Sequence, residues 1–323
     1  MSEVGDIVLC IRATIGDRNW SDNQYCLGRG VAGLRADEKR LNQQYLWHWV
    51  GFSAHQLKSK GRGATFLQVC KADIASLEIP LPPLAEQKRI AAILDAADAL
   101  RAKRRESLAQ LDTLLQSTFL NMFGDPVTNP KGWEVKKLDD LVTKLGDGLH
   151  GTPIYSESGN YYFVNGNNLR DGKIHIDNST KRVDETEYLK HKRELNDTTM
   201  LVSINGTIGK VAFYDGENIV LGKSACYFNL KTEQINSQYL YHQINSQYFM
   251  DYAIGQATGS TIKNVSLKTM RSFPVLYAPL DLQRCFATIV ESIERQKTLL
   301  RAHLTELDTL FDSLQSRAFN GEL

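Results

Sequence analysis

An internal repeat constrains the fold of this 323-residue chain more than any other feature. Four pairs of segments match in the same order: residues 8–16 with 201–209, 41–50 with 235–244, Pro83-Leu84 with Pro279-Leu280, and 108–117 with 304–313. The second pair is identical at five of ten positions and the last at six of ten. The offset rises only from 193 to 196 residues, as small loop insertions would cause. Because solenoid repeats have far shorter periods, the sequence predicts a duplicated unit that combines a domain with a helix.

Each copy ends in a segment whose apolar residues recur every three or four positions for more than four heptads. The stripes include Ile90, Leu94, Leu108, Leu111 and Leu115 in copy one, and Phe286, Val290, Leu300, Leu304, Leu307 and Phe311 in copy two. They predict long helices over 84–123 and 282–318, and a helix of about 35 residues is about 52 Å long. Two such stripes favour an antiparallel helix pair. The alternative is that each stripe packs on its own domain.

The two copies are unequal in length. About 70 residues (126–196) precede the first matched segment of copy two, against about seven in copy one. The predicted divisions are an incomplete first domain (1–83), a first long helix (84–125), a complete second domain (126–279) and a second long helix (280–323). Short strand-like runs between residues 161 and 230, separated by Asn, Asp and Gly turns, and one helix over 237–252 indicate an α+β fold.

Composition excludes some classes of protein. With 42% hydrophobic residues the chain can build real cores, so a disordered tail is excluded. A transmembrane helix is not expected, because no run of 18 apolar residues occurs, and a signal peptide is not expected, because the start lacks a basic segment. The five cysteines are odd in number and far apart, which predicts reduced, mostly buried thiols in a cytoplasmic protein. A net charge of +1 does not bear on nucleic-acid binding.

No motif for catalysis, metal or cofactor binding stands out. The sequence has neither a Gly-x-x-x-x-Gly-Lys-Ser/Thr phosphate loop nor a Cys-x-x-Cys pair. Asp125 and Glu134, close to Lys136, superficially offer a nuclease-like acidic pair that could hold Mg²⁺. Asp125 lies in a Gly-Asp-Pro turn, however, so a structural role is favoured over a catalytic one. His48 and His242 occupy matched positions beside aromatic residues and are interpreted as structural.

Polar side chains of copy two are candidates for DNA contact. Asn and Gln can pair with adenine edges, whereas Arg and Lys can pair with guanine or clamp phosphate. The candidates are Lys144, His150, Thr152, Asn165, Asn168, Lys181, Arg182, Asn205, Thr207, Lys210, Ser260 and Lys263. Composition alone supports this weakly, because residues 126–200 carry 11 basic and 12 acidic side chains.

Several motifs resemble those of type I restriction–modification specificity (S) subunits. They are Pro-Leu-Pro-Pro-Leu-Ala-Glu-Gln-Lys-Arg-Ile at 80–90, Phe-Leu-Asn-Met-Phe-Gly-Asp-Pro at 119–126, Gly132-Trp133 with Lys137-Leu138, Gly-Thr-Ile-Gly-Lys at 206–210, and the ending Arg-Ala-Phe-Asn-Gly-Glu-Leu at 317–323. The resemblance covers essentially the whole chain. It implies two target-recognition domains, each followed by a long helix, with the helices forming an antiparallel coiled-coil spacer.

The resemblance also implies a function and partners. Each recognition domain would read one half of a bipartite site in double-stranded DNA, and the chain itself would be non-catalytic and without a cofactor. The helices, through their outward faces, would dock methyltransferase (M) subunits that supply S-adenosylmethionine and methylate adenine. A motor–nuclease (R) subunit would bring ATP and Mg²⁺ chemistry and cut unmodified DNA. No membrane partner is expected.

Copy one departs from the family pattern. It lacks a counterpart of residues 126–196, and it has Arg12-Ala13 where copy two has Asn205-Gly206, and Asp17 where copy two has Lys210. Three explanations stay open: the true start lies upstream, the sequence is a gene fragment, or the protein works with one intact recognition domain. Two functional hypotheses follow: a sequence-specific DNA-recognition subunit, or a truncated interaction scaffold that binds methyltransferase without reading a complete site. Self-association, with two chains supplying two intact domains, is a further expectation, because an open sheet edge favours association.

Overall fold

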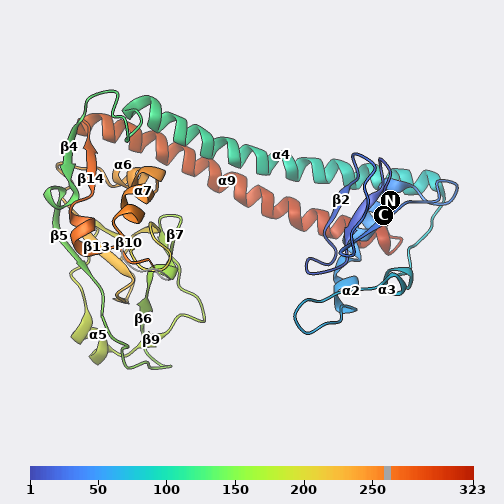
Figure 1. Cartoon of the computed structure of the whole chain (residues 1–323), viewed down its shortest axis with the longest axis horizontal. Helices are drawn as coiled ribbons and strands as arrows, with labels where there is room; N and C mark the ends of the chain where they lie inside the picture. The colour runs from blue at the N-terminus through green and yellow to red at the C-terminus, as the bar shows by residue number, and fades with distance from the viewer. Residues whose placement is uncertain (258–262) are drawn as a thin grey trace. The chain divides into compact units, whose positions relative to one another are not determined.

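The computed structural model describes residues 1–257 and 263–323 and divides the chain into two compact units. Unit 1 comprises residues 1–110 and 296–323, and unit 2 lies within 111–295. Both long helices, α4 (Leu84–Phe123) and α9 (Leu280–Phe319), contribute to both units (Figure 1).

Unit 1 is built on a three-stranded antiparallel sheet in the order β2-β1-β3. Its elements are β1 (Ile7–Cys10), β2 (Arg18–Trp20), β3 (Val31–Leu34), α1 (Gln43–Phe52), α2 (Ala54–Ser59) and α3 (Lys71–Ala75). Buried residues alternate along β1, so Ile7 and Leu9 face the core. That core joins the sheet and α1 to the start of α4 and the end of α9.

Unit 2 is larger and centres on a four-stranded sheet in the order β11-β10-β13-β5. Its strands are β4 (Glu134–Lys137), β5 (Val142–Asp147), β6 (Tyr161–Val164), β7 (Leu169–Arg170), β8 (Lys173–Ile174), β9 (Arg182–Val183), β10 (Thr199–Ser203), β11 (Val211–Phe213), β12 (Ile219–Leu221), β13 (Ala225–Leu230) and β14 (Pro274–Tyr277). Its helices are η1 (Leu138–Leu141), η2 (Gly166–Asn168), α5 (Glu185–His191), α6 (Ser237–Ile244), α7 (Gln247–Gly255) and α8 (Leu267–Arg271). Smaller sheets β12-β6-β9, β14-β4 and β7-β8 flank the main one.

The sequence repeat is reproduced in hydrogen bonds. The Tyr45 hydroxyl donates to the carbonyl of Pro80 at 3.0 Å, and its counterpart Tyr239 donates to Leu276 at 2.9 Å. Strands β1, β2 and β3 of unit 1 correspond to β10, β11 and β13 of unit 2, with the same order and antiparallel pairing. The duplication predicted from sequence is therefore present in the fold.

A buried glutamine fixes the start of each long helix. Gln87 accepts a hydrogen bond from the backbone N–H of Asn42 and donates one to the carbonyl of Pro82, both at 2.8 Å. Gln283 makes the equivalent two bonds in unit 2, at 2.8 and 2.7 Å. The glutamine of each Pro-Leu motif therefore joins the first turn of the helix to the domain.

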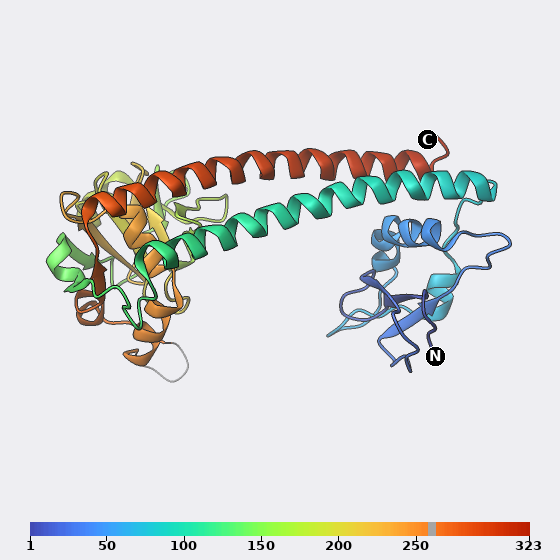
Figure 2. The same ribbon diagram turned by 90° about the horizontal axis from the view of Figure 1, so that it is seen from above.

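The two long helices pair antiparallel, as the stripes predict. In unit 1 the Arg101 guanidinium lies 2.6 Å from Asp308, while Arg89, earlier in α4, donates to the carbonyl of Leu323 at 2.8 Å. In unit 2 the ring of Phe119 lies 5.5 Å from that of Phe286. Figure 2 shows α4 and α9 in a second view. The α+β class and the antiparallel long helices are thus confirmed.

The stripe residues pack both against the other long helix and against the adjacent domain, the two alternatives that the sequence left open. Ile90, Leu94, Leu115, Phe286, Val290 and Phe311 are buried, and Leu108, Leu111, Leu300, Leu304 and Leu307 are half-buried. In unit 1 one core contains Leu94 of α4, Phe311 of α9 and Tyr45 of the domain. The stripes therefore contact the partner helix and the adjacent domain together.

Three expectations of local structure are wrong. The single helix over 237–252 is two helices, because Asn245 ends α6 and the Ser246 side chain caps α7 by accepting from Phe249 N–H. Strand-like residues 173–176 form only the two-residue strand β8. The cysteines are not mostly buried: all five are free, but only Cys226 is buried, and Cys26, Cys70 and Cys285 are exposed.

Candidate nucleic-acid interface

Several strand ends of unit 2 converge on one rim. Ser203 at the end of β10 pairs with Ala225 at the start of β13, and Asp147 at the end of β5 pairs with Cys226. Leu149 N–H donates to the carbonyl of Leu221 at 2.7 Å, which ties the end of β12 to the same place. We call the rim formed by residues 147–152, 165–168, 204–210, 222–224 and 263–264 the loop edge.

The loop after β10 is held in shape by glycines. Gly206 and Gly209 have φ of 74° and 82°, values that favour glycine. A Cβ on Gly209 would lie 2.8 Å from Met250 Sδ, so the backbone approaches α7 closely. Gly206 N–H donates to Lys263 O at 3.2 Å. The Gly-Thr-Ile-Gly-Lys motif therefore makes a tight turn that leaves Thr207 and Lys210 exposed.

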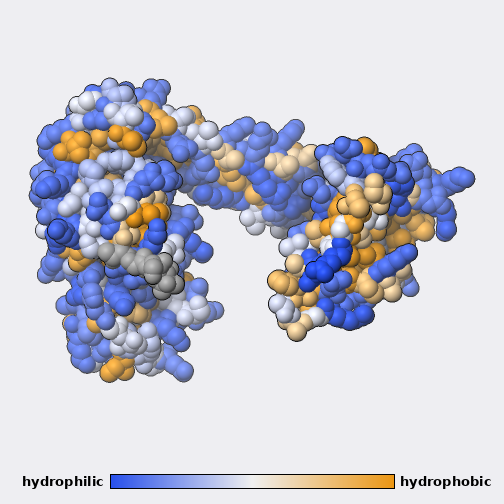
Figure 3. All heavy atoms as spheres, in the orientation of Figure 1, coloured by the Kyte–Doolittle hydropathy of each residue, from blue (hydrophilic) through white to orange (hydrophobic). Residues whose placement is uncertain are grey.

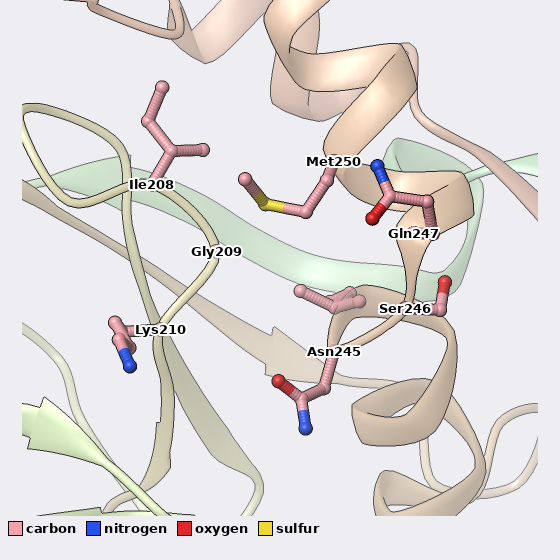
Figure 4. A pocket seen from close by; sticks show the side chains of 8 residues that line it. Ile208, Gly209, Lys210, Asn245, Ser246, Gln247 and Met250 are labelled. Carbon is pink, nitrogen blue, oxygen red and sulfur yellow. The ribbon is translucent and has the colours of Figure 1, made fainter. Parts of the chain in front are cut away.

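A cavity of about 250 Å³ lies between this turn and the junction of α6 and α7. It is lined by Ile208, Gly209, Lys210, Ile244, Asn245, Ser246, Gln247 and Met250 (Figure 4). Figure 4 shows Ile208 and Met250 on one side of the cavity and Lys210 and Asn245 on the other. The cavity thus has a cation from the turn and an amide from the junction of α6 and α7 next to a small apolar surface.

Part of the predicted DNA-contact set comes together at the loop edge. Asn205 forms a bridge with Asn264, which places the turn beside Lys263. His150 and Thr152 follow β5 and are exposed, and the His150 ring lies 2.6 Å from the Asp147 carboxylate. Ser260 lies outside the described residues.

Three other candidates are engaged within the protein. The Asn165 side chain accepts from the Ser224 hydroxyl at 3.0 Å. The Asn168 side chain accepts from Asn165 N–H and donates to the carbonyl of His175, both at 3.0 Å. Arg182 lies over the Tyr162 ring, 5.1 Å from its centroid. These groups stabilise turns and strands.

Lys144 is also paired, whereas Lys181 is exposed. The ammonium of Lys144 contacts the Glu194 carboxylate. That hydrogen bond raises the pKa of Lys144 and lowers the pKa of Glu194. The charge of Lys144 is thus largely compensated before any ligand arrives.

Lys223 is a loop-edge cation that residue-by-residue reading of the sequence missed. It is exposed, and its backbone N–H donates to the carbonyl of Leu149 at 3.0 Å. In the described part of the chain, the ion pairs do not include Lys210, Lys223 or Lys263. Lys223 lies two residues before β13, and the sequence pattern does not show that β13 pairs with β5.

The residues considered as a nuclease-like pair or as possible ligands, Asp125, Glu134 and His48, have structural partners within the protein. Asp125 accepts a hydrogen bond from Val127 N–H at 2.8 Å, as in a capped turn, and the exposed Glu134 lies 3.9 Å from Lys136. His48 Nε2 lies 2.7 Å from Asp95, and burial lowers the pKa of His48. Within residues 1–257 and 263–323, no group of three or more His, Cys, Asp or Glu side chains could hold a metal.

The outward faces of the long helices carry exposed leucines. They are Leu100, Leu114 and Leu120 on α4, and Leu299 and Leu310 on α9, with exposed fractions between 46% and 57%. Exposed apolar side chains mark a docking surface where they form a contiguous patch. Of the helices that the structure describes, none combines the length and apolar character needed to cross a membrane.

Comparison with known proteins identifies the family. The model of the type I restriction modification DNA specificity domain matches residues 3–111 and 130–309. The MjaIX specificity subunit of Methanocaldococcus jannaschii is 23% identical over 99% of this chain and 78% of its own length. The EcoKI specificity subunit of Escherichia coli is 24% identical over 92% of this chain and 69% of its own length. A putative MjaX specificity subunit of Methanocaldococcus jannaschii is 35% identical, but over only 33% of this chain and 25% of its own length.

Solved structures share the fold. The S subunit of a type I system from M. genitalium superposes with a TM-score of 0.52 at 15% identity, over 99% of this chain and 84% of that one. A chain from a solved type I restriction–modification assembly gives 0.61 at 18% identity, over 99% and 83%. The two matched stretches of the family model cover both copies of the repeat. The chain therefore belongs to the family of type I restriction–modification specificity subunits, whose role is DNA recognition.

Proposed function

We propose that the loop edge of unit 2 reads one half of a bipartite DNA site and that the chain directs adenine methylation and restriction to that site. The observation that carries this proposal is the set of three exposed lysines, Lys210, Lys223 and Lys263, on one rim beside Asn205 and Thr207. Lysines can clamp phosphates, and an Asn amide such as that of the half-buried Asn205 can pair with an adenine edge, so the rim carries both positioning and reading groups.

Partner subunits would supply the chemistry. We propose that the exposed leucines of α4 and α9 dock methyltransferase subunits, which bring S-adenosylmethionine, and that a motor–nuclease subunit joins this cytoplasmic complex with ATP and Mg²⁺. The chain itself would need no cofactor. The family membership and the helix pair support this division of labour.

The test is the methylation pattern in a host. The chain is co-expressed with its methyltransferase subunit, and host DNA is sequenced by a method that detects methyladenine. A bipartite asymmetric motif supports the proposal and means that both halves are read. A palindromic bipartite motif also supports it and means that two chains associate and that unit 2 of each chain reads one half. A stable complex that leaves no motif would establish the alternative scaffold function, which the smaller sheet of unit 1 favours.

Variants locate the reading surface. Lys210→Ala or Lys223→Ala should weaken DNA binding by the assembled complex and reduce the slope of log affinity against log salt by about 1, as loss of one phosphate contact requires. Lys144→Ala is the matched control, because Lys144 is already paired with Glu194. If all three variants have the same salt slope, Lys210 and Lys223 do not contact phosphates, and the DNA-binding surface is not the loop edge.

A further inference from the structure

Arg193 lies beside the loop edge, in the segment that joins α5 to β10. Its guanidinium Nε donates to the backbone carbonyl of Asp147, the first residue of the loop edge, at 2.9 Å. The Arg193 side chain is exposed, and it is not among the DNA-contact candidates that the sequence suggests. Figure 3 shows mainly hydrophilic residues on the visible face of unit 2, at the left of the view, and interfaces with DNA are more polar than those with proteins.

The backbone next to Arg193 is held by contacts that do not use its side chain. The buried side chain of Asn229 in β13 donates to the carbonyl of Glu194 at 3.0 Å. The same side chain accepts a hydrogen bond from the Thr199 hydroxyl at 2.7 Å, which orients its amide. Leu195 packs against a hydrophobic cluster of unit 2. Arg193 is therefore placed by its neighbours, and its own hydrogen bond serves to orient the guanidinium.

The charged side chains around Arg193 are already paired. The Lys144 ammonium contacts the Glu194 carboxylate. The Asp147 carboxylate lies 2.6 Å from the His150 ring. In the part of the chain that the structure describes, the ion pairs do not include Arg193. Because Nε is occupied by a carbonyl, the two Nη groups are the donors left for a ligand, and they lie in one plane as a fork.

A fork oriented in this way suits a base edge better than a phosphate. A phosphate contact needs a positive charge, and exposed lysines such as Lys210 and Lys223 supply one from a flexible stem. A pair of hydrogen bonds to one base also needs a defined orientation of the guanidinium plane. The bond from Arg193 Nε to the backbone restricts rotation of that plane, which reading of a base requires and charge neutralisation does not.

The donors of the fork also select the base. In the major groove guanine presents two neighbouring acceptors, O6 and N7, and arginine can pair with both. Adenine presents one acceptor beside an amine donor, and cytosine presents an amine donor. Because a guanidinium has donors and no acceptor, it makes its full pair of bonds only with guanine.

We propose that Arg193 reads one guanine in the DNA half-site bound by unit 2, through hydrogen bonds from its two Nη groups to O6 and N7. The Asp147 carbonyl is the group that positions the guanidinium. This inference rests on the proposed function of the loop edge, and it adds to that surface a residue that determines base specificity.

The test measures base preference in the complex of the full chain with its methyltransferase subunit. The methyladenine motif of host DNA gives the site, and competition binding then compares duplexes in which each position of the site is replaced in turn. Arg193→Gln keeps a long polar side chain but loses the two-donor fork. Its preference for one guanine should fall by about 5- to 150-fold, the change to which 1–3 kcal/mol corresponds. Preferences at the other positions should stay as in the native complex.

Lys192→Gln is the matched control, because Lys192 is the exposed neighbour and its substitution removes the same charge. It should keep every base preference of the native complex. Hydrogen exchange of unit 2 should be the same in both variants and the native chain, so that a change in preference does not come from misfolding.

Two results would overturn the proposal while leaving the proposed function intact. One is an equal loss of affinity of Arg193→Gln for every duplex, with a salt slope reduced by about 1, which would mean that Arg193 clamps a phosphate. The other is a full set of native preferences in Arg193→Gln. A native complex without preference at any position would contradict the proposed function itself, and the reading of guanine by Arg193 with it.

Discussion

At the scale of single residues, the repeat allows each copy to serve as a control for the other. Ala13 and Gly206 occupy matched positions in the loop that follows the first matched strand, with φ of 61° and 74°. The left-handed region costs a residue with a Cβ about 1–2 kcal/mol, whereas glycine enters it freely. The two copies therefore meet the same backbone requirement with different residues.

Exchanging these residues should change stability in opposite directions. Gly206→Ala should lower the free energy of unfolding by about 1 kcal/mol, because alanine is strained at positive φ. Ala13→Gly should leave the free energy of unfolding unchanged or raise it by about 0.5 kcal/mol, because glycine relieves that strain but increases the entropy of the unfolded chain. A Cβ on Gly206 would meet no atom within 4 Å, so backbone strain alone is tested. Urea unfolding monitored by hydrogen exchange gives the free energy of unfolding of each unit. An unaffected Gly206→Ala protein would contradict the strain argument.

Acid should weaken unit 1 through Asp6. Arg35 donates to both Asp6 oxygens, at 2.7 and 2.8 Å, and this hydrogen bonding lowers the pKa of Asp6 below its ordinary value of 3.8. The stabilisation is therefore present above about pH 4 and is lost as the pH falls through the folded pKa. Asp6→Asn should be less stable than the native chain at pH 6 and should approach it at pH 3.

Tryptophan fluorescence during urea unfolding can measure the stability of unit 1 at each pH, because three of the four tryptophans (20, 47 and 49) lie in unit 1. Glu38→Gln, at an exposed carboxylate, is the control and should keep the same offset from the native chain at each pH. A constant difference between Asp6→Asn and the native chain from pH 6 to pH 3 would count against the ion pair as its cause.

At the scale of elements, the start of each long helix depends on one buried amide. Gln283 is fully buried and joins Asn236 N–H to the carbonyl of Ala278. Gln283→Met has a similar shape but leaves both backbone groups without a partner, so it should cost about 1–3 kcal/mol. Gln87→Met should cost a similar amount in unit 1. Urea unfolding measures the free energy of unfolding of both variants. A decrease below about 0.5 kcal/mol in each would mean that water satisfies the two backbone groups in place of the amide.

The sequence predicts the long elements better than the short ones. The stripes predict α4 and α9 because more than four heptads of apolar spacing outweigh local uncertainty. Residues 237–252 are wrongly predicted as one helix, because two aromatic-rich turns hide the break at Asn245. Strands β4, β5 and β14 are missed, because their stability comes from partners distant in sequence.

For the candidate site, the sequence predicts residue types but not their partners. The Gly-Thr-Ile-Gly-Lys segment stands out in the sequence only by its resemblance to the family, and the positive φ of its two glycines is known from the structure. Asn165 and Asn168 have the residue types that contact bases, yet their amides bond within the protein. Lys223 joins the loop edge only when the sheet brings β5 and β13 together. Residue type predicts chemistry, whereas the partner of each group depends on tertiary pairing.

At the scale of the whole molecule, each long helix has two roles: it packs against the other long helix, and it presents an outward face to partner subunits. Residues of a single helix turn serve the two roles separately. Leu307 lies in the stripe and is half-buried, whereas Leu310 is 50% exposed on the same part of α9. An inward leucine stabilises the helix pair, and an outward one is free to contact a partner subunit. Substitution by the same charged residue at the two positions therefore distinguishes loss of the spacer from loss of the partner.

Leu307→Asp should lower the free energy of unfolding by about 1–3 kcal/mol, because it places an unpaired charge in a packed seam. Methylation directed by the complex should then be lost. Leu310→Asp should leave the isolated chain within about 0.5 kcal/mol of the native one, yet weaken co-purification of the methyltransferase subunit. Urea unfolding of the isolated chain and methyladenine sequencing of host DNA measure the two effects. Native methylation with Leu307→Asp would refute the helix pair as a required spacer, and unchanged co-purification with Leu310→Asp would place methyltransferase docking on another face.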